Sequence, residues 1–82
     1  MKEAGAWYVY ILLCGDGTLY TGITNDLKKR LAAHKAGTGA RYTAQRGAKK
    51  IIYSEICASR SAASKREYQI KKMSRSAKLK LI

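Results

Sequence analysis

The segment that decides the fold is residues 7–24, WYVYILLCGDGTLYTGIT. Residues 7–13 are aromatic, aliphatic or β-branched throughout, which is typical of a buried strand. Residues 14–17, Cys-Gly-Asp-Gly, have the composition of a tight turn, and residues 18–24 return to strand-forming residues. The sequence therefore predicts a β-hairpin.

The turn of this hairpin decides where Tyr20 points. A two-residue Asp-Gly turn places Tyr20 and Tyr10 on opposite faces of the hairpin, because side chains alternate along a strand. A three-residue Gly-Asp-Gly turn instead pairs Tyr20 with Leu12 and Tyr10 with Gly22. We predict the second register, since a left-handed glycine such as Gly17 is typical of three-residue turns. Both tyrosines then share one face, with space beside Tyr10, although each also fits an ordinary strand position.

Helix and strand signals follow the hairpin. Thr24 or Asn25 is suited to cap a helix from Asp26 to about residue 36, and the basic, glycine-rich residues 37–48 predict a mobile loop. The remaining predicted elements are a strand at 49–57, a helix from Ser59 or Ser61 to about Met73, and a short helix from Ser74 or Ser76 onward. The order β-β-α-β-α-α predicts an α+β fold in which helices flank a small three-stranded antiparallel sheet. We expect residues 1–82 to form one domain.

The charge balance indicates an anionic partner. Seventeen Lys and Arg residues face five Asp and Glu, which gives a formal net charge of +12. Nucleic acid is the commonest partner of such a chain. A membrane surface is less suitable, because the helix candidates lack bulky apolar residues, and no stretch is long enough to span a bilayer. We expect no signal peptide and, with two cysteines outside any zinc motif, a cytoplasmic protein with reduced thiols.

The first predicted helix carries charge on its sheet-facing stripe. That stripe, at i, i+3, i+4 and i+7, consists of Leu27, Arg30, Leu31 and His34. A charge on an inner stripe is costly unless it is paired or borders a cleft. Arg30 and His34 therefore either line a functional cleft or, as structural residues, reach solvent and cap the helix end.

Carboxylates are scarce enough to be sorted individually. Glu3, Asp16, Asp26 and Glu55 lie in a tail, a turn, a helix start and a strand. Glu67 alone lies in the middle of a helix, where it either holds a metal or pairs with the lysine four residues later. A site with so few carboxylates suits Mg²⁺, which keeps several waters and takes phosphate oxygens from its substrate.

At this point the chain resembles a known family. Tyr8-Val9-Tyr10 and Tyr20-Thr21-Gly22 resemble the two motifs that name the GIY-YIG nucleases. Arg30, His34 and Glu67 follow at the spacing of that family, so the resemblance spans about residues 7–73. Residues 37–43, GTGARYT, are similar to the small bacterial members that consist of little but this domain.

The resemblance implies a metal-dependent nuclease that acts on DNA. Glu67 would hold one divalent metal, Mg²⁺ with Mn²⁺ as a substitute, and Tyr10 would act as general base with His34 taking or relaying its proton. Arg30 would clamp the phosphate and Tyr20 would orient water or phosphate. Because free tyrosine is a weak acid, Arg30, the metal and nearby lysines would have to favour the phenolate.

Two other functions stay open. The family often uses a late Asn near the active site, whereas the one Asn here is Asn25, so the chain is alternatively a non-catalytic nucleic-acid-binding module. A basic partner for an acidic protein is the third reading. No motif names a protein partner. We expect phosphate contacts from basic residues, and from Tyr42 either base stacking or packing back on the domain; the residues concerned are Lys28, Lys29, Lys35, Arg41, Tyr42, Arg46, Lys71 and Lys72.

Overall fold

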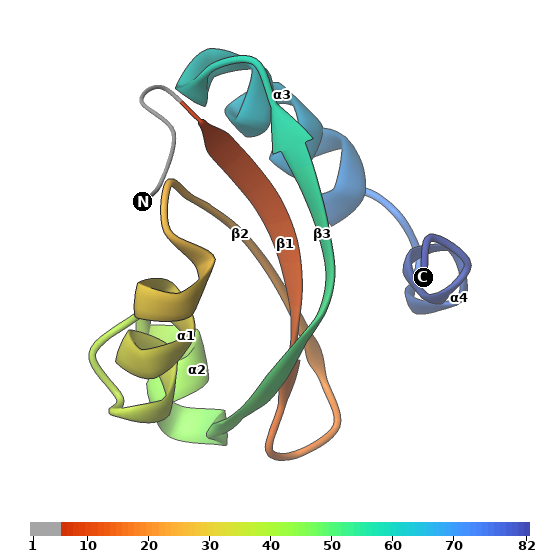
Figure 1. Cartoon of the computed structure of the whole chain (residues 1–82). Helices are drawn as coiled ribbons and strands as arrows, with labels where there is room; N and C mark the ends of the chain where they lie inside the picture. Colours follow the sequence, from red (N-terminus) through yellow and green to blue (C-terminus); the bar gives the residue numbers. More distant parts are fainter. Residues whose placement is uncertain (1–5) are drawn as a thin grey trace.

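Three antiparallel strands form one sheet in the order β2-β1-β3 in the computed structural model, which describes residues 6–82 (Figure 1). Glu3 and the start of the predicted domain therefore lie outside the described residues. The elements are β1 (Trp7–Cys14), β2 (Leu19–Thr24), α1 (Leu27–Lys35), α2 (Arg41–Arg46), β3 (Ala48–Cys57), α3 (Arg60–Lys71) and α4 (Arg75–Leu79). The predicted α+β class, the three-stranded antiparallel sheet and the order of the predicted elements are confirmed, and α2 is an addition.

The hairpin has the predicted register. Tyr10 pairs with Gly22 and Leu12 pairs with Tyr20 across β1 and β2. Gly17 closes the turn with φ of 86°, in the left-handed region that favours glycine, and its N–H donates to the Cys14 carbonyl at 3.0 Å. Turn chemistry alone therefore placed both tyrosines on one face of the sheet.

Each face of the sheet has its own buried cluster. On one face Tyr10, Leu12 and Cys14 are buried, and Leu27 and Leu31 of α1 pack against them. On the other face Val9 and Ile11 are buried together with a residue of α3, Ile70. Figure 1 shows α1 and α2 on one side of the sheet and α3 on the other. The central strand β1, whose residues 9–12 are all buried, thus contributes to both cores.

Side-chain oxygens cap α1, α3 and α4. Asp26, and neither Thr24 nor Asn25, is the N-cap of α1: its carboxylate accepts a hydrogen bond from the Lys29 N–H at 3.1 Å. Ser59 caps α3 and Ser74 caps α4, which resolves the two alternatives that the sequence left at each helix start.

The prediction of a loop over residues 37–48 is wrong for its second half. Residues 41–46 form α2, although its N-cap, Ala40, offers no side-chain hydrogen bond. Its helical signal is weak, so contacts with the rest of the fold stabilise it: Thr43 is buried against the site described below, and Arg46 forms an ion pair with Asp16 of the hairpin turn at 3.2 Å.

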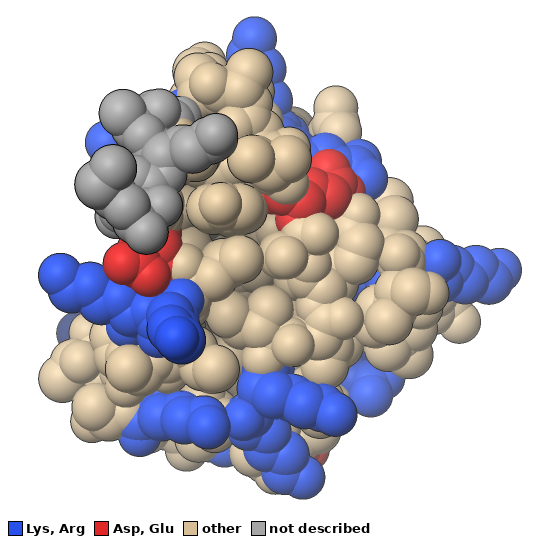
Figure 2. All heavy atoms as spheres, in the orientation of Figure 1, with Lys and Arg blue, Asp and Glu red and all other residues tan. Residues whose placement is uncertain are grey.

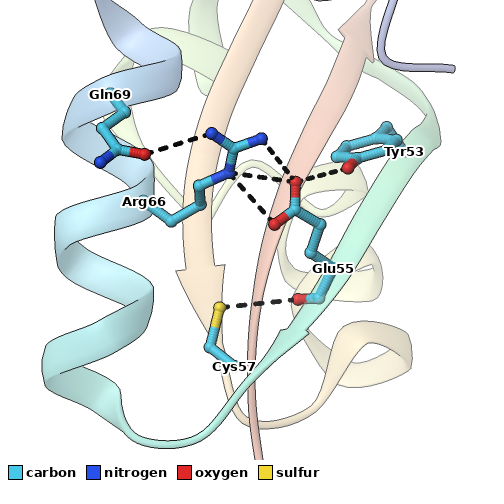
Figure 3. Close-up of polar contacts among 5 residues, drawn as sticks. All are labelled: Tyr53, Glu55, Cys57, Arg66 and Gln69. Atoms are coloured by element: carbon cyan, nitrogen blue, oxygen red, sulfur yellow. Dashed lines mark hydrogen bonds and ion pairs between the residues drawn. The ribbon is translucent and has the colours of Figure 1, made fainter.

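A polar cluster joins β3 to α3 on the face opposite Tyr10 (Figure 3). The Arg66 guanidinium donates to both carboxylate oxygens of Glu55, with Nε–Oε1 at 3.1 Å and Nη2–Oε2 at 3.0 Å, and Tyr53 donates to the same carboxylate. Both charged side chains are less than a third exposed. Hydrogen bonds from Arg66, followed by Tyr53, hold the pKa of Glu55 below its ordinary value of 4.5. The sequence analysis gave Glu55 no partner.

Replacing Arg66 with Met is expected to lower the free energy of unfolding by about 1–2 kcal/mol at pH 7, because the half-buried Glu55 loses its cation while the aliphatic stem is kept. The folded-state pKa of Glu55 is lowered, so this stabilisation is present above pH 4.5 and is lost as the pH falls through the folded-state value. Urea unfolding of wild type and variant at pH 7 and pH 3 measures it. An equal difference at both pH values would contradict an ionic origin, and Gln69→Ala, which removes the outer contact of Arg66, is the matched control.

Among residues 6–82, no helix combines the length and the apolar character needed to cross a membrane. The two free cysteines lie at strand ends, with Cys14 ending β1 and Cys57 ending β3.

Candidate active site

The hairpin brings Tyr10 and Tyr20 together. Their ring centroids are 6.4 Å apart, and Tyr10 is fully buried. Gly22 provides the space for the Tyr10 hydroxyl, because a Cβ at this position would lie 2.6 Å from Tyr10 Oη and 3.0 Å from a ring carbon of Tyr20. The predicted structural role of Gly22 thus has a direct steric basis.

Helix α1 adds Arg30 and His34 to the same place. His34 Nε2 lies 2.7 Å from Tyr10 Oη, and Arg30 Nε donates to the same oxygen at 3.4 Å. The His34 ring is 1% exposed and lies edge-on to Tyr20, with centroids 5.3 Å apart. The two polar residues of the inner stripe of α1 therefore contact one phenol, rather than reaching for solvent.

The surroundings shift the pKa values of Tyr10 and His34 in opposite directions. Burial raises the pKa of Tyr10 above 10.0, and the hydrogen bond and charge of Arg30 only partly offset this effect. Burial, followed by the charge of Arg30, lowers the pKa of His34 below 6.5. At neutral pH the phenol thus keeps its proton and the imidazole is uncharged. The requirement that nearby cations favour the phenolate is not met by Arg30 alone.

Thr43 is a member of this cluster that the sequence analysis missed. Its hydroxyl lies 2.7 Å from His34 Nδ1, on the far side of the ring from Tyr10, and it is completely buried. The available signal was the GTGARYT stretch at residues 37–43, which was noted for its resemblance and not for its contacts.

Glu67 lies on the sheet-facing stripe of α3 together with the buried Ala63 and Ile70. Its carboxylate is 3.3 Å from Lys71 Nζ, so the ion pair weighed from the sequence is present. Its side chain is still 23% exposed. Behind burial, its charge also contributes to raising the pKa of Tyr10, so it lies within electrostatic range of that phenol.

One accessible carboxylate fits Mg²⁺ and fits poorly with metals that need several protein ligands. Residues 6–82 contain no group of three or more His, Cys, Asp or Glu side chains arranged to hold a metal. Mg²⁺ characteristically keeps waters and uses substrate phosphate oxygens alongside one or two carboxylates. Glu67 is thus suited to such an ion only when the phosphate is also present.

A cleft opens beside Arg30 where β1, β2, α1 and α3 meet. Its volume is about 340 Å³. Arg60 Cζ lies 5.5 Å from the centroid of the Trp7 ring at this cleft. The two arginines and the amide of Asn25 make it suitable for an anion. Asn25 was predicted only as a possible helix cap, and no site role was predicted for Trp7 or Arg60. The residues that line the cleft are Trp7, Ile23, Thr24, Asn25, Arg30 and Arg60.

Basic side chains gather over α1 and α2, on the left and lower parts of the face in Figure 2. The exposed members are Lys28, Lys29, Lys35 and Arg41. Other predicted phosphate contacts are engaged within the protein: Arg46 pairs with Asp16, Lys71 with Glu67, and Lys72 Nζ lies 4.3 Å from the Tyr68 ring centroid.

Tyr42 packs back on the domain and also extends the aromatic row. Its ring is 5.8 Å from that of Tyr20, and Arg46 Cζ lies 4.1 Å from its centroid. It remains 37% exposed, so one side of the row Tyr10–Tyr20–Tyr42 reaches the surface.

Comparisons with known proteins identify the family of this chain. The family model described as the GIY-YIG catalytic domain matches residues 6–80. The chain is 53% identical over 75 residues to a UPF0213 protein of Clostridium perfringens, covering 92% of this chain and 81% of that protein. It is 50% identical over 78 residues to one of Desulfotalea psychrophila, covering 94% and 71%. The solution NMR structure of the UPF0213 protein BH0048 from Bacillus halodurans matches with a TM-score of 0.57 at 41% identity, over 93% of this chain and 81% of that one. This chain therefore belongs to the GIY-YIG family, whose members have a nuclease fold, and it is similar to the small UPF0213 proteins within it.

Proposed function

We propose that this protein is a metal-dependent nuclease that hydrolyses phosphodiester bonds in DNA. The observation that carries the proposal is the contact of the half-buried Arg30 with the buried Tyr10 and His34, with the phenol oxygen 3.4 Å from Arg30 Nε and 2.7 Å from His34 Nε2. A guanidinium, a phenol and an imidazole cost free energy to bury and add little to a core. Perturbed titrating groups in mutual contact beside a cleft are the usual mark of a catalytic site.

In this proposal Tyr10 is the general base, and His34 enables that role by accepting the phenolic proton. The attacking water gives its proton to the Tyr10 oxygen as Tyr10 gives its own proton to Nε2 of the uncharged His34. The water oxygen bonds to phosphorus, the P–O ester bond breaks, and the leaving oxygen takes a proton from solvent. His34 then releases its proton to solvent, which restores both groups. Burial suits His34 to this role because its lowered pKa keeps the ring uncharged, and an uncharged imidazole has one nitrogen able to accept a proton.

The other residues hold the phosphate. Arg30 lies at the cleft and at Tyr10 simultaneously, so a phosphate bound by its free N–H groups would sit beside the base. Arg60 lines the same cleft, and Tyr20, whose side chain hydrogen-bonds with Arg30, offers a second hydroxyl. A divalent metal held by Glu67, Mg²⁺ or Mn²⁺, would offset negative charge that develops on the phosphate.

The basic surface selects the substrate class. Exposed lysines and Arg41 on α1 and α2 provide sequence-independent phosphate contacts, which favour a polyanion such as DNA. The surface Tyr42 beside Tyr20 supplies a stacking face for a base. Two free thiols, Cys14 and Cys57, fit a reducing compartment, so we place the protein in the cytoplasm.

The test is a cleavage assay on a mixed panel of duplex, single-stranded and branched DNA and of RNA, with Mg²⁺, with Mn²⁺ and with a chelator. We expect cleavage of DNA that requires the metal. A Glu67→Gln variant purified identically is the control for contaminating nuclease, and equal cleavage by both preparations would reject the proposal. Preferential cleavage of RNA would overturn the DNA assignment alone.

A non-catalytic nucleic-acid-binding module is the second candidate. The pairing of Glu67 with Lys71 favours it, because an occupied carboxylate has no need of a metal. Binding without cleavage on every substrate of the panel would establish it. In either case log K should fall linearly with log salt concentration; a shallow dependence would instead indicate an acidic protein partner.

A further inference from the structure

The buried hydroxyl of Thr43 contacts the His34 ring on the side away from Tyr10. Thr43 Oγ1 lies 2.7 Å from His34 Nδ1 and donates to the Ala40 carbonyl at 3.1 Å. Thr43 belongs to α2, the helix that lacks a side-chain cap, and it is 0% exposed. No step assigned so far to the proposed site uses this residue.

The positions of the donors fix the direction of the hydrogen bonds. Thr43 has one hydroxyl proton, and donating it to Ala40 leaves the oxygen as an acceptor for His34 Nδ1–H. On the other side, Arg30 can only donate to the Tyr10 oxygen, so the phenolic proton needs an acceptor, which is His34 Nε2. With these directions, the Tyr10 hydroxyl, both ring nitrogens of His34 and the Thr43 hydroxyl each have a suitable hydrogen-bond partner.

The opposite arrangement is poorer. If Nε2 carried the proton, both Arg30 and His34 would donate to the Tyr10 oxygen, and the phenolic proton would have no acceptor in these contacts. Thr43 would also have to choose between Nδ1 and the Ala40 carbonyl. Leaving a buried donor unsatisfied costs about 1–3 kcal/mol, so the first arrangement is preferred. A doubly protonated ring is opposed by burial and by the charge of Arg30.

We propose that Thr43 is a positioning residue that holds His34 as the neutral Nδ1–H tautomer and so keeps Nε2 available as the acceptor of the Tyr10 proton. The catalytic consequence rests on the proposed nuclease function, whereas the tautomer itself does not. The proton has a defined path: the Tyr10 O–H bond breaks, the His34 Nε2–H bond forms, and Thr43 keeps its contact with Nδ1–H as the ring becomes charged.

Gly39 supports this role for α2. A Cβ at Gly39 would lie 2.5 Å from His34 Nδ1 and 3.0 Å from the His34 Cα, so the absence of a side chain lets the backbone before α2 close over the ring. The other polar groups that face His34 are Tyr10, Tyr20 and Arg30. None of these three hydrogen-bonds to Nδ1. The hydrogen bond that orients the ring at this nitrogen is therefore the one with Thr43.

The chain contains one histidine, so ¹⁵N-histidine labelling gives one ring spectrum to interpret. In the full-length wild type we expect a protonated Nδ1 and an unprotonated Nε2 at pH 7.5. Thr43→Val keeps the shape and removes the acceptor, and we expect a substantial population of the Nε2–H form. Thr43→Ser keeps the hydroxyl and should restore the wild-type spectrum.

A wild-type ring that carries its proton on Nε2 would overturn the proposal, as would a folded Thr43→Val protein with unchanged ring resonances. If the Val variant does not fold, the wild-type and Ser spectra still decide the tautomer. Cleavage should fall about tenfold or more in the Val variant and be restored by Ser. Because the spectra need no activity, an inactive wild type with the expected tautomer would reject only the nuclease function.

Discussion

Replacing Tyr10 with Phe is expected to lower the rate of DNA cleavage by at least about 10²-fold while nucleic-acid affinity stays within about twofold, because a general base contributes 10²–10⁴-fold and makes no contact needed for binding. The substitution removes one oxygen from a fully buried ring and leaves its volume almost unchanged. Arg30 and His34 both hydrogen-bond to that oxygen, so its loss removes both contacts at once.

Stability must be separated from catalysis in this variant. Loss of the phenol leaves buried His34 Nε2 without its donor, which costs about 1–3 kcal/mol. Tyr53→Phe is the matched control: it also removes a hydrogen-bonded hydroxyl, the one that donates to Glu55 on the other face of the sheet. We expect Tyr53→Phe to be destabilised and fully active. Single-turnover cleavage and urea unfolding measure the two effects, and equal loss of cleavage in both variants would mean that stability alone had been tested.

The second large effect is expected at Glu67. Glu67→Gln keeps the shape of the side chain and removes its charge, so metal-dependent cleavage should fall by about 10³-fold, equivalent to several kcal/mol of transition-state stabilisation. Excess Mn²⁺ should not restore it. Binding of DNA without metal should remain or strengthen slightly, because the variant loses a negative charge next to the phosphate.

Lys71 separates a metal role for Glu67 from a purely structural ion pair. Lys71→Gln breaks the same 3.3 Å contact but keeps the carboxylate. If Glu67 holds a metal, this variant should bind DNA more weakly, yet cleave saturating DNA at the wild-type rate and need less Mg²⁺ for half-maximal activity. If the pair is structural, Lys71→Gln should lose as much cleavage as Glu67→Gln. Titration of Mg²⁺ at saturating DNA distinguishes the two outcomes.

Much of the site was predictable because it depends on local chemistry. The Gly-Asp-Gly turn set the hairpin register, which in turn set the shared face of Tyr10 and Tyr20. The helical period put Arg30 and His34 one turn apart on an inner stripe, and the structure joins both to Tyr10. The hairpin register and the shared helical stripe depend only on a short turn and on helical spacing, whereas the contacts of Arg30 and His34 with Tyr10 formed when α1 packed on the sheet.

The excess of basic residues was also fixed by the sequence, since charge composition does not depend on the fold. Which of those basic residues remain available for a partner does depend on the fold. Arg46 and Lys71 are each occupied by a carboxylate, whereas Lys28, Lys29 and Lys35 are exposed on α1.

Only the tertiary structure determined α2 and the contact of Thr43 with His34. Residues 41–46 have no capping side chain and form fewer than two helical turns, so their own propensity is too weak to specify a helix. They are helical because Thr43 is buried against His34 and Arg46 reaches Asp16, and no local sequence signal indicates that these segments pair. The same reason applies to the cleft of Asn25 and Arg60 and to the pair of Glu55 with Arg66. The raised pKa of Tyr10 belongs to this group as well, because desolvation arises only when the sheet and α1 close around the phenol.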